Sequence, residues 1–212
     1  MAVQMMERPT AEAPVQLSGK MTYEEFLDWL DEDTHADWVN GVAMMHRPVS
    51  LQHQQIHKFL LQLLDTFVQT RDLGTVAHDP FQMKTGSELP GRAPDILFVA
   101  DENLGRLKPN VLDGPADLVV EVVSPSSRAL DRGAKYYEYE QGGVREYWLV
   151  DPERRQAEFY VLGSRGVYDT VLVAEDGVYR SRVLDGLWMK VDWLWQDPLP
   201  PVLGVLKEWG LL

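Results

Sequence analysis

Two carboxylates and one lysine stand where they could act together on a phosphate ester. Asp95 directly precedes the apolar residues 96–99, and Glu121 lies within a second apolar run, residues 118–123. Lys135 follows a short serine-rich segment. Carboxylates bind hard cations such as Mg²⁺ or Mn²⁺, and an ammonium can orient an attacking water or steady phosphate charge. A metal-dependent phosphodiesterase needs these groups.

The two apolar runs predict short strands that are buried on both faces. Pro94 breaks the chain just before the first of them. Burying an ionised carboxylate costs on the order of several kcal/mol unless it is paired or bound to a cation, so Glu121 inside a strand needs a partner. The alternative is that Glu121 lies at the open end of its strand and is solvated. We expect the site where the two strands adjoin.

The serine-rich segment SPSS, residues 124–127, predicts the start of a helix over residues 127–141 that carries Asp131, Arg132 and Lys135 in its first turns. The strand, helix, strand unit 117–150 predicts a parallel crossover, which is right-handed in nearly all proteins. Such a helix lies over a face of the sheet, so the long side chain of Lys135 could reach back to the carboxylates. With antiparallel hairpins on either side, the predicted fold is α/β, a mixed β-sheet flanked by helices.

The segments APDILFV, DLVVEVVSPSS and GVREYWLVDP, with the Lys135 and Tyr139 pair between them, resemble the Uma-type family of restriction endonucleases. This family is a branch of the PD-(D/E)XK nuclease superfamily, and the resemblance runs from about residue 23 to residue 195. It implies a restriction-endonuclease-like core, DNA as substrate and Mg²⁺ or Mn²⁺ as cofactor. It also implies that Asp95 and Glu121 bind the metal.

The lysine position departs from the superfamily's usual spacing. That lysine usually stands two residues after the glutamate, where this chain has Val123. In the Uma-type branch a lysine on the following helix takes its place, which carries over to Lys135. The family pattern also has a Glu before a hairpin, which Asp37 matches with a shorter side chain, and a backbone carbonyl near Val122 would complete the metal shell. Asp37 has the alternative of a surface residue beside a turn.

Other polar residues have simpler explanations. His53 and His57 have a helical spacing that can bind zinc, but no third strong ligand is apparent, so a structural or solvated pair is favoured. His53 does match a His of the family pattern and could line the cleft. Ser124 and Ser126 fit helix capping better than nucleophilic catalysis, because neither lies in a GxSxG elbow.

Two residues of the predicted helix keep open alternatives. Asp131 could pair with Arg128 or with Lys135, or it could only favour the helix N-terminus. Tyr139 is one turn beyond Lys135, and a tyrosine there is more often part of a core than catalytic.

The composition is that of one ordinary globular domain. The chain has 212 residues, 45% of them apolar and 25% charged, so residues 21–212 are expected to form a single domain after a disordered tail over residues 1–20. The resemblance implies that this domain is nuclease-like. It has no cysteine, which excludes disulfides and thiolate metal sites. No apolar run is long enough to span a membrane and no signal peptide is apparent, so a cytoplasmic protein is predicted.

The formal net charge of −13 is unusual for a nuclease. The excess is uneven: residues 21–40 have acids but no Lys or Arg, whereas residues 84–135 are nearly balanced. A neutral or basic cleft on an acidic body is therefore possible. The alternative function is a catalytically silent nucleic-acid-binding or regulatory module that keeps the nuclease fold. Three features favour that alternative: Val123 at the usual lysine position, Asp37 in place of the family's Glu, and the acidic net charge.

Several further elements follow from local patterns. They are a capped helix from Thr22 to near Asp33, a hairpin around Asn40-Gly41, a helix over residues 50–70, a strand over 74–83, a strand over 146–150, and a hairpin of AEFYVLG with VYDTVLVA. The segment after Leu187 has four of the seven tryptophans, Trp188, Trp193, Trp195 and Trp209. That much aromatic surface favours a symmetric homodimer, although these side chains could simply cover the core.

Overall fold

The structure is a computed structural model that describes residues 20–31, 33–173 and 175–212. The predicted tail lies outside this part of the chain except for Lys20, as does the end of the second hairpin strand at residue 174. In the described part no helix is long and apolar enough to cross a membrane.

A six-stranded mixed sheet forms the centre of the molecule. Its order is β11-β10-β9-β8-β6-β3. The bounds are β3 Gly74–His78, β6 Ile96–Ala100, β8 Leu118–Val122, β9 Glu146–Asp151, β10 Gln156–Leu162 and β11 Tyr168–Thr170. Only β8 and β9 run parallel, and the other neighbours are antiparallel. The predicted mixed sheet, the parallel β8 and β9 pair, and the hairpin of β10 with β11 are confirmed.

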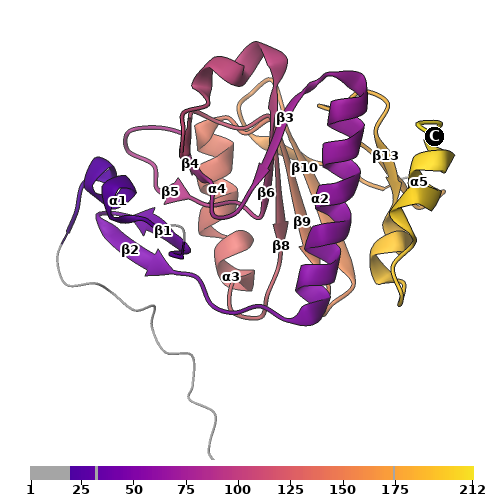
Figure 1. Ribbon diagram of the computed structural model, residues 1–212, viewed down its shortest axis with the longest axis horizontal. Helices are drawn as coiled ribbons and strands as arrows, with labels where there is room; N and C mark the ends of the chain where they lie inside the picture. The colour runs from indigo at the N-terminus through magenta and orange to yellow at the C-terminus, as the bar shows by residue number, and fades with distance from the viewer. Residues whose placement is uncertain (1–19, 32, 174) are drawn as a thin grey trace, which may run out of the picture.

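Alternating side chains of this sheet enter two cores on its opposite faces. Ile96, Phe98 and Val120 pack with the apolar face of α2 (Leu51–Arg71). Leu97 and Val119 enter the second core, together with residues of α4 (Ala134–Gly142). Figure 1 shows the strands of this sheet between α2 on one side and α3 and α4 on the other. Both faces are therefore covered, as the continuous apolar runs predict.

The single helix predicted over residues 127–141 is wrong. The segment forms two helices, α3 (Arg128–Asp131) and α4, separated at Arg132 and Gly133 (Figure 1). Gly133 has φ −114° and ψ −98°, far from helical values. A Cβ added there would lie 2.6 Å from the Ala129 carbonyl oxygen, so this close turn requires glycine. The break gives α4 its own start, just before Lys135.

The single strand predicted over residues 74–83 is also wrong. The chain forms β3 and then β4 (Gln82–Lys84), which belong to different sheets. Between them lies Asp79-Pro80, and proline has no N–H to continue a ladder. The second sheet has the order β2-β1-β5-β4-β7. Its other strands are β1 Ala36–Val39, β2 Val42–Met45, β5 Gly91–Arg92 and β7 Val111–Asp113.

The N-terminal elements match their local signals. Thr22 and Glu25 form the predicted capping box of α1 (Tyr23–Trp29), which ends before Asp33. The turn between β1 and β2 has positive φ at Asn40 and Gly41, 51° and 89°, as a tight hairpin turn requires. Between β6 and β7 the chain forms a 3₁₀-helix, η1 (Asp101–Arg106).

The C-terminal segment covers the outer side of α2. It consists of β12 (Val178–Arg180), β13 (Trp188–Lys190), the 3₁₀-helix η2 (Val191–Trp195) and α5 (Val202–Glu208). Trp193 is buried in the α2 core, and Trp188, Trp195 and Trp209 pack against that core. Figure 1 shows α5 beside α2. The tryptophans therefore cover the core, the simpler of the two explanations for them.

The homodimer remains a prediction, which now rests on the frequency of twofold assemblies and on the two strands of a duplex. Light scattering at micromolar protein concentration is expected to give twice the mass of the chain. A monomer mass would contradict it.

Gly74 connects α2 to the central sheet in a conformation that L residues rarely adopt. Its φ is 141°, and an added Cβ would lie 2.1 Å from the Val99 carbonyl oxygen. We predict that Gly74→Ala lowers the free energy of unfolding by about 2 kcal/mol or more. Urea titration followed by circular dichroism measures this loss. Gly105→Ala is the control: its Cβ meets no atom within 4 Å, so its midpoint should stay near the wild-type value.

Candidate active site

Asp95 and Glu121 face each other across neighbouring strands. In the antiparallel pair of β6 and β8, Ile96 is opposite Val120, so the next pair in this register is Asp95 and Glu121. Asp95 Oδ2 accepts the Val122 N–H at 2.6 Å, which fixes the carboxylate against β8. Because side chains alternate along a strand, both residues belong to the sheet face that α4 covers.

Glu121 is buried, with 3% of its surface exposed, so a solvated strand end is wrong. Its Oε1 accepts the Tyr139 hydroxyl at 2.7 Å and lies 2.9 Å from the Lys135 ammonium nitrogen. Within the described residues, both of these contacts involve the same carboxylate oxygen. The second oxygen, Oε2, is left available to a ligand.

Lys135 is buried in the first turn of α4 rather than displayed on its surface. Its ammonium nitrogen contacts Glu121 and lies 3.3 Å from Asp131 Oδ1. Burial opposes the charge, but the carboxylates of Glu121 and Asp131 raise the pKa of Lys135 above its usual value. The lysine is therefore an ammonium held between the carboxylates of Glu121 and Asp131.

The cluster has a surplus of buried negative charge. Burial raises the pKa of Glu121 to about 8, Asp95 and Asp131 add to the rise, and Lys135 opposes it. Burial also raises the pKa of Asp131. Burial alone would raise the pKa of Asp95, but His53, Lys135 and the Val122 N–H together lower it. The site thus lacks positive charge, and its available oxygens, Asp95 Oδ1 and Glu121 Oε2, are hard ligands that fit Mg²⁺ or Mn²⁺.

Asp37 is buried next to this cluster, but both of its oxygens are engaged. Arg92 donates to Oδ2 at 2.9 Å, while the Ala93 N–H and the His46 ring contact Oδ1 at 2.9 and 3.1 Å. Burial opposes ionisation, but His46 and Arg92 hold the pKa of Asp37 well below its usual range. A direct metal contact by Asp37 would have to share an oxygen with one of these partners.

His53 and His57 have different partners although they are one helical turn apart. The His53 Nε2 atom lies 3.6 Å from Asp95 Oδ2, and this carboxylate raises the pKa of His53 although burial opposes the rise. The Val122 backbone contributes to the same rise. His57 instead contacts the Asp95 carbonyl oxygen at 2.9 Å. Ser124, Ser126 and Ser127 form hydrogen bonds with one another in the turn before α3. These bonds do not pair a serine with the general base that a nucleophile needs.

Sequence reasoning missed the ion pairs that hold α4 in place. Arg92 donates from Nε and Nη2 to both oxygens of Glu138, each at 2.8 Å, and from Nη1 to Asp37. This fork links the second sheet to α4. Arg92 follows a loop, so the sequence gives no local signal for it.

Tyr139 is a core residue, as its position one turn beyond Lys135 predicted. The sequence did not show that its hydroxyl also bonds Glu121.

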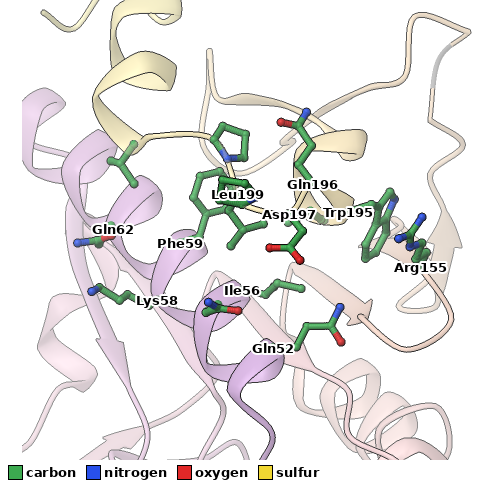
Figure 2. Close-up of a pocket in the computed structure, with 15 residues that line it drawn as sticks. Gln52, Ile56, Lys58, Phe59, Gln62, Arg155, Trp195, Gln196, Asp197 and Leu199 are labelled. Atoms are coloured by element: carbon green, nitrogen blue, oxygen red, sulfur yellow. The ribbon is translucent and has the colours of Figure 1, made fainter.

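A separate hollow of about 420 Å³ lies between the N-terminal half of α2 and the C-terminal segment. Figure 2 shows Gln52, Lys58 and Phe59 of α2 on one side of it and Trp195, Asp197 and Leu199 on the other. Asp197 is the one carboxylate among its lining residues, and none of the lining residues belongs to the cluster around Glu121. This pocket therefore does not coincide with the acidic site around Glu121.

A family model described as "Uma2: Putative restriction endonuclease" matches residues 23–192. The chain belongs to the Uma2 family. Among solved structures, it is similar to one described as a putative nuclease belonging to DUF820 from Anabaena variabilis, with a TM-score of 0.69 and 15% identity. The match covers 82% of this chain and 97% of that one. No curated protein matches the chain.

Uma2 membership and the shared fold support a nuclease, an enzyme that hydrolyses nucleic acid. The resemblance read from the motifs and the predicted nuclease-like α/β core are both confirmed. The roles of individual residues remain predictions.

Glu121 is expected to exchange a proton for a divalent cation. Its pKa is raised from 4.5 to about 8 in the folded, metal-free protein. Protonated Glu121 therefore stabilises the fold most below about pH 4.5, and this contribution, on the order of a few kcal/mol, is lost as the pH rises to 8. At pH 7, Mn²⁺ binding should release up to one proton, and affinity should rise towards pH 8. Calorimetric titration in buffers of different ionisation enthalpy measures the release.

Two isosteric variants test the assignment of ligands. Glu121→Gln and Asp95→Asn should each abolish Mn²⁺ binding while keeping the circular dichroism spectrum. The metal-free Glu121→Gln protein should be at least as stable as the wild type at pH 8, because an amide carries no charge to bury. Unchanged Mn²⁺ affinity in both variants would remove Asp95 and Glu121 as ligands.

Proposed function

We propose that this Uma2 protein is a metal-dependent endonuclease that hydrolyses DNA phosphodiester bonds, with Mg²⁺ or Mn²⁺ as cofactor. The observation that carries the proposal is the meeting of Asp95, Glu121 and Lys135. Two carboxylates from adjoining strands each keep an oxygen without a hydrogen bond or ion pair among the described residues, Asp95 Oδ1 and Glu121 Oε2. The ammonium of Lys135 lies 2.9 Å from the other oxygen of Glu121, Oε1. A lone structural ion pair would not need the second carboxylate.

Asp95 and Glu121 would hold the cation, with the Val122 carbonyl as a third ligand. When bound, the cation lowers the pKa of water and neutralises charge that develops on phosphate. Asp95 is held by the Val122 N–H and Glu121 by the Tyr139 hydroxyl, so both enter the reaction with fixed orientations. Tyr139 acts here as a positioning residue.

Lys135 would orient the attacking water and stabilise phosphate charge. Its raised pKa keeps it cationic at neutral pH, which suits electrostatic stabilisation and not proton abstraction. Asp131 lies within 3.3 Å and directs the ammonium. Asp37 would act indirectly, by fixing Arg92 and thereby α4, unless it reaches the metal through water.

The acidic surface bears on how DNA would bind. Arg92 pairs with Asp37 and Glu138, and Arg128 and Arg132 pair with Asp151 and its neighbours. These arginines therefore supply little unbalanced positive charge to a phosphate backbone. We infer that affinity for DNA depends on the bound cation and Lys135. Weak binding with a shallow dependence on salt follows from this inference, because few phosphate charges would be neutralised by the protein.

Plasmid cleavage tests the proposal directly. The purified chain with Mn²⁺ or Mg²⁺ should convert supercoiled plasmid to nicked or linear forms, and a chelator should stop the reaction. Glu121→Gln prepared in parallel excludes a contaminating nuclease. Intact plasmid at every metal concentration, with Mn²⁺ bound as shown by calorimetry, would instead favour the catalytically silent module. The cytoplasmic location also remains a prediction.

Lys135→Ala is predicted to lower the cleavage rate by about 10²-fold or more, the usual scale for one lost electrostatic donor. Its Mn²⁺ affinity should stay within about tenfold of the wild type, because the ammonium acts on water and phosphate rather than on the cation. Lys135→Arg should not restore the rate, since a planar guanidinium does not replace a compact ammonium. Single-turnover cleavage and calorimetry separate the two effects.

The matched control is Lys190→Ala, which removes an exposed pair with Glu208. Such pairs contribute roughly 0.2–1 kcal/mol to stability and nothing to chemistry. Lys135→Gln gives a second test if the alanine variant unfolds. Wild-type rates in folded Lys135 variants would remove the lysine from the mechanism.

A further inference from the structure

A second group of side chains that could bind a metal lies beside the backbone of Asp95. His57 of α2, His78 at the end of β3 and the following Asp79 place their donor atoms within 4.8 Å of one another. Among the residues that the structure describes, no other group of three or more His, Cys, Asp or Glu side chains meets that spacing. Neither Asp95 nor Glu121 belongs to it.

The separations suit a common metal ion. Asp79 Oδ1 lies 3.7 Å from His57 Nε2 and 3.8 Å from His78 Nδ1. His35 Nδ1 approaches the other oxygen of Asp79, at 3.5 Å. Donors bound tetrahedrally to zinc at about 2.1 Å are roughly 3.4 Å apart. The two Asp79 Oδ1 separations are within about half an ångström of that value, and all three donors lie within 4.8 Å of one another. His78 Nδ1 also contacts the Asp79 carbonyl oxygen at 2.8 Å, a contact that a metal at this nitrogen would replace.

The donor types differ from those of the proposed catalytic pair. Imidazole nitrogens with one carboxylate favour zinc, cobalt or nickel, whereas carboxylates alone favour magnesium and manganese. The residues also come from separate parts of the chain: His35 precedes β1, His57 is on α2, His78 ends β3 and Asp79 follows it. An ion at this point would tie the two sheets to α2.

We propose that His57, His78 and Asp79 form a binding site for a zinc-class transition metal, with His35 as the fourth ligand. The sequence offered no third ligand for a pair of His53 and His57. In the structure the partners of His57 are instead His78 at the end of β3 and Asp79 after it. The proposal does not depend on nuclease activity, because its ligands are not those of the proposed catalytic site.

The site would be coupled to Asp95 through the backbone. The Asp95 carbonyl oxygen contacts His57 Nε2 at 2.9 Å and accepts the Asp79 N–H at 3.3 Å. A metal that takes His57 Nε2 would replace its hydrogen bond to this carbonyl. Occupancy therefore changes what holds the peptide whose side chain faces Glu121. The second metal is a structural clamp with a direct connection to the first site.

The test uses the full chain with the catalytic pair disabled, Asp95→Asn with Glu121→Gln. Titration with Co²⁺ is expected to bind one equivalent and to give visible absorption bands of a nitrogen-ligated ion. Zn²⁺ should displace Co²⁺ and raise the melting temperature, whereas a hundredfold excess of Mg²⁺ should do neither.

Adding His78→Ala or Asp79→Asn to that background should weaken Co²⁺ binding by tenfold or more and abolish the zinc-dependent rise in melting temperature. His78 is about half exposed, so its variant should stay folded, and His35→Ala provides a further test. His46→Gln is the control, because its imidazole contacts Asp37 and lies outside the group. Absence of a bound equivalent, or affinity unchanged by the His78 and Asp79 variants, would overturn the proposal.

Discussion

The buried carboxylate of Glu121 is the constraint on which this arrangement depends. A charge in the middle of β8 can be tolerated only if partners reach it from the face of the sheet that α4 covers. Tyr139 and Lys135 do so from one side of α4, and the Arg92 fork to Glu138 and Asp37 holds that helix to the second sheet. Even so, the raised pKa of Glu121 leaves a demand for positive charge that a divalent cation would meet. The fold and the proposed chemistry thus share one electrostatic requirement.

Much of the fold could be predicted because its strands are read locally. The apolar runs around Asp95 and Glu121, the Asn40-Gly41 turn and the Thr22 capping box each specify structure within a few residues. The errors came where one residue overrides a longer pattern. Gly133 interrupts an otherwise helical segment through a close approach to the Ala129 carbonyl, and Pro80 ends a strand that continues in a different sheet. Neither preference is strong enough in sequence to fix the break.

The candidate site was predictable in its centre and not in its surroundings. Asp95 and Glu121 lie in apolar strand motifs and Lys135 in the crossover helix that follows, so their meeting could be expected although the lysine has an unusual spacing. The partners of Asp37 could not: Arg92 comes from a two-residue strand and His46 from the end of a hairpin, and only the packing of the second sheet brings them together. His57 was judged by its helix neighbour His53, whereas its contacts come from β3 and Asp79. Long-range contacts of this kind have no local periodicity.

The C-terminal cover of α2 limits how far the chain can be shortened. The family match ends at residue 192, yet Trp193, Leu194, Val205 and Leu206 are buried in the α2 core, and the Trp209 ring meets Phe67 at 5.5 Å between centroids. A fragment cut at the family boundary would lose these residues and expose part of the apolar face of α2, an apolar surface prone to aggregate. A shortened chain designed from the family boundary alone would therefore be prone to insolubility, even though it keeps every residue of the proposed catalytic site.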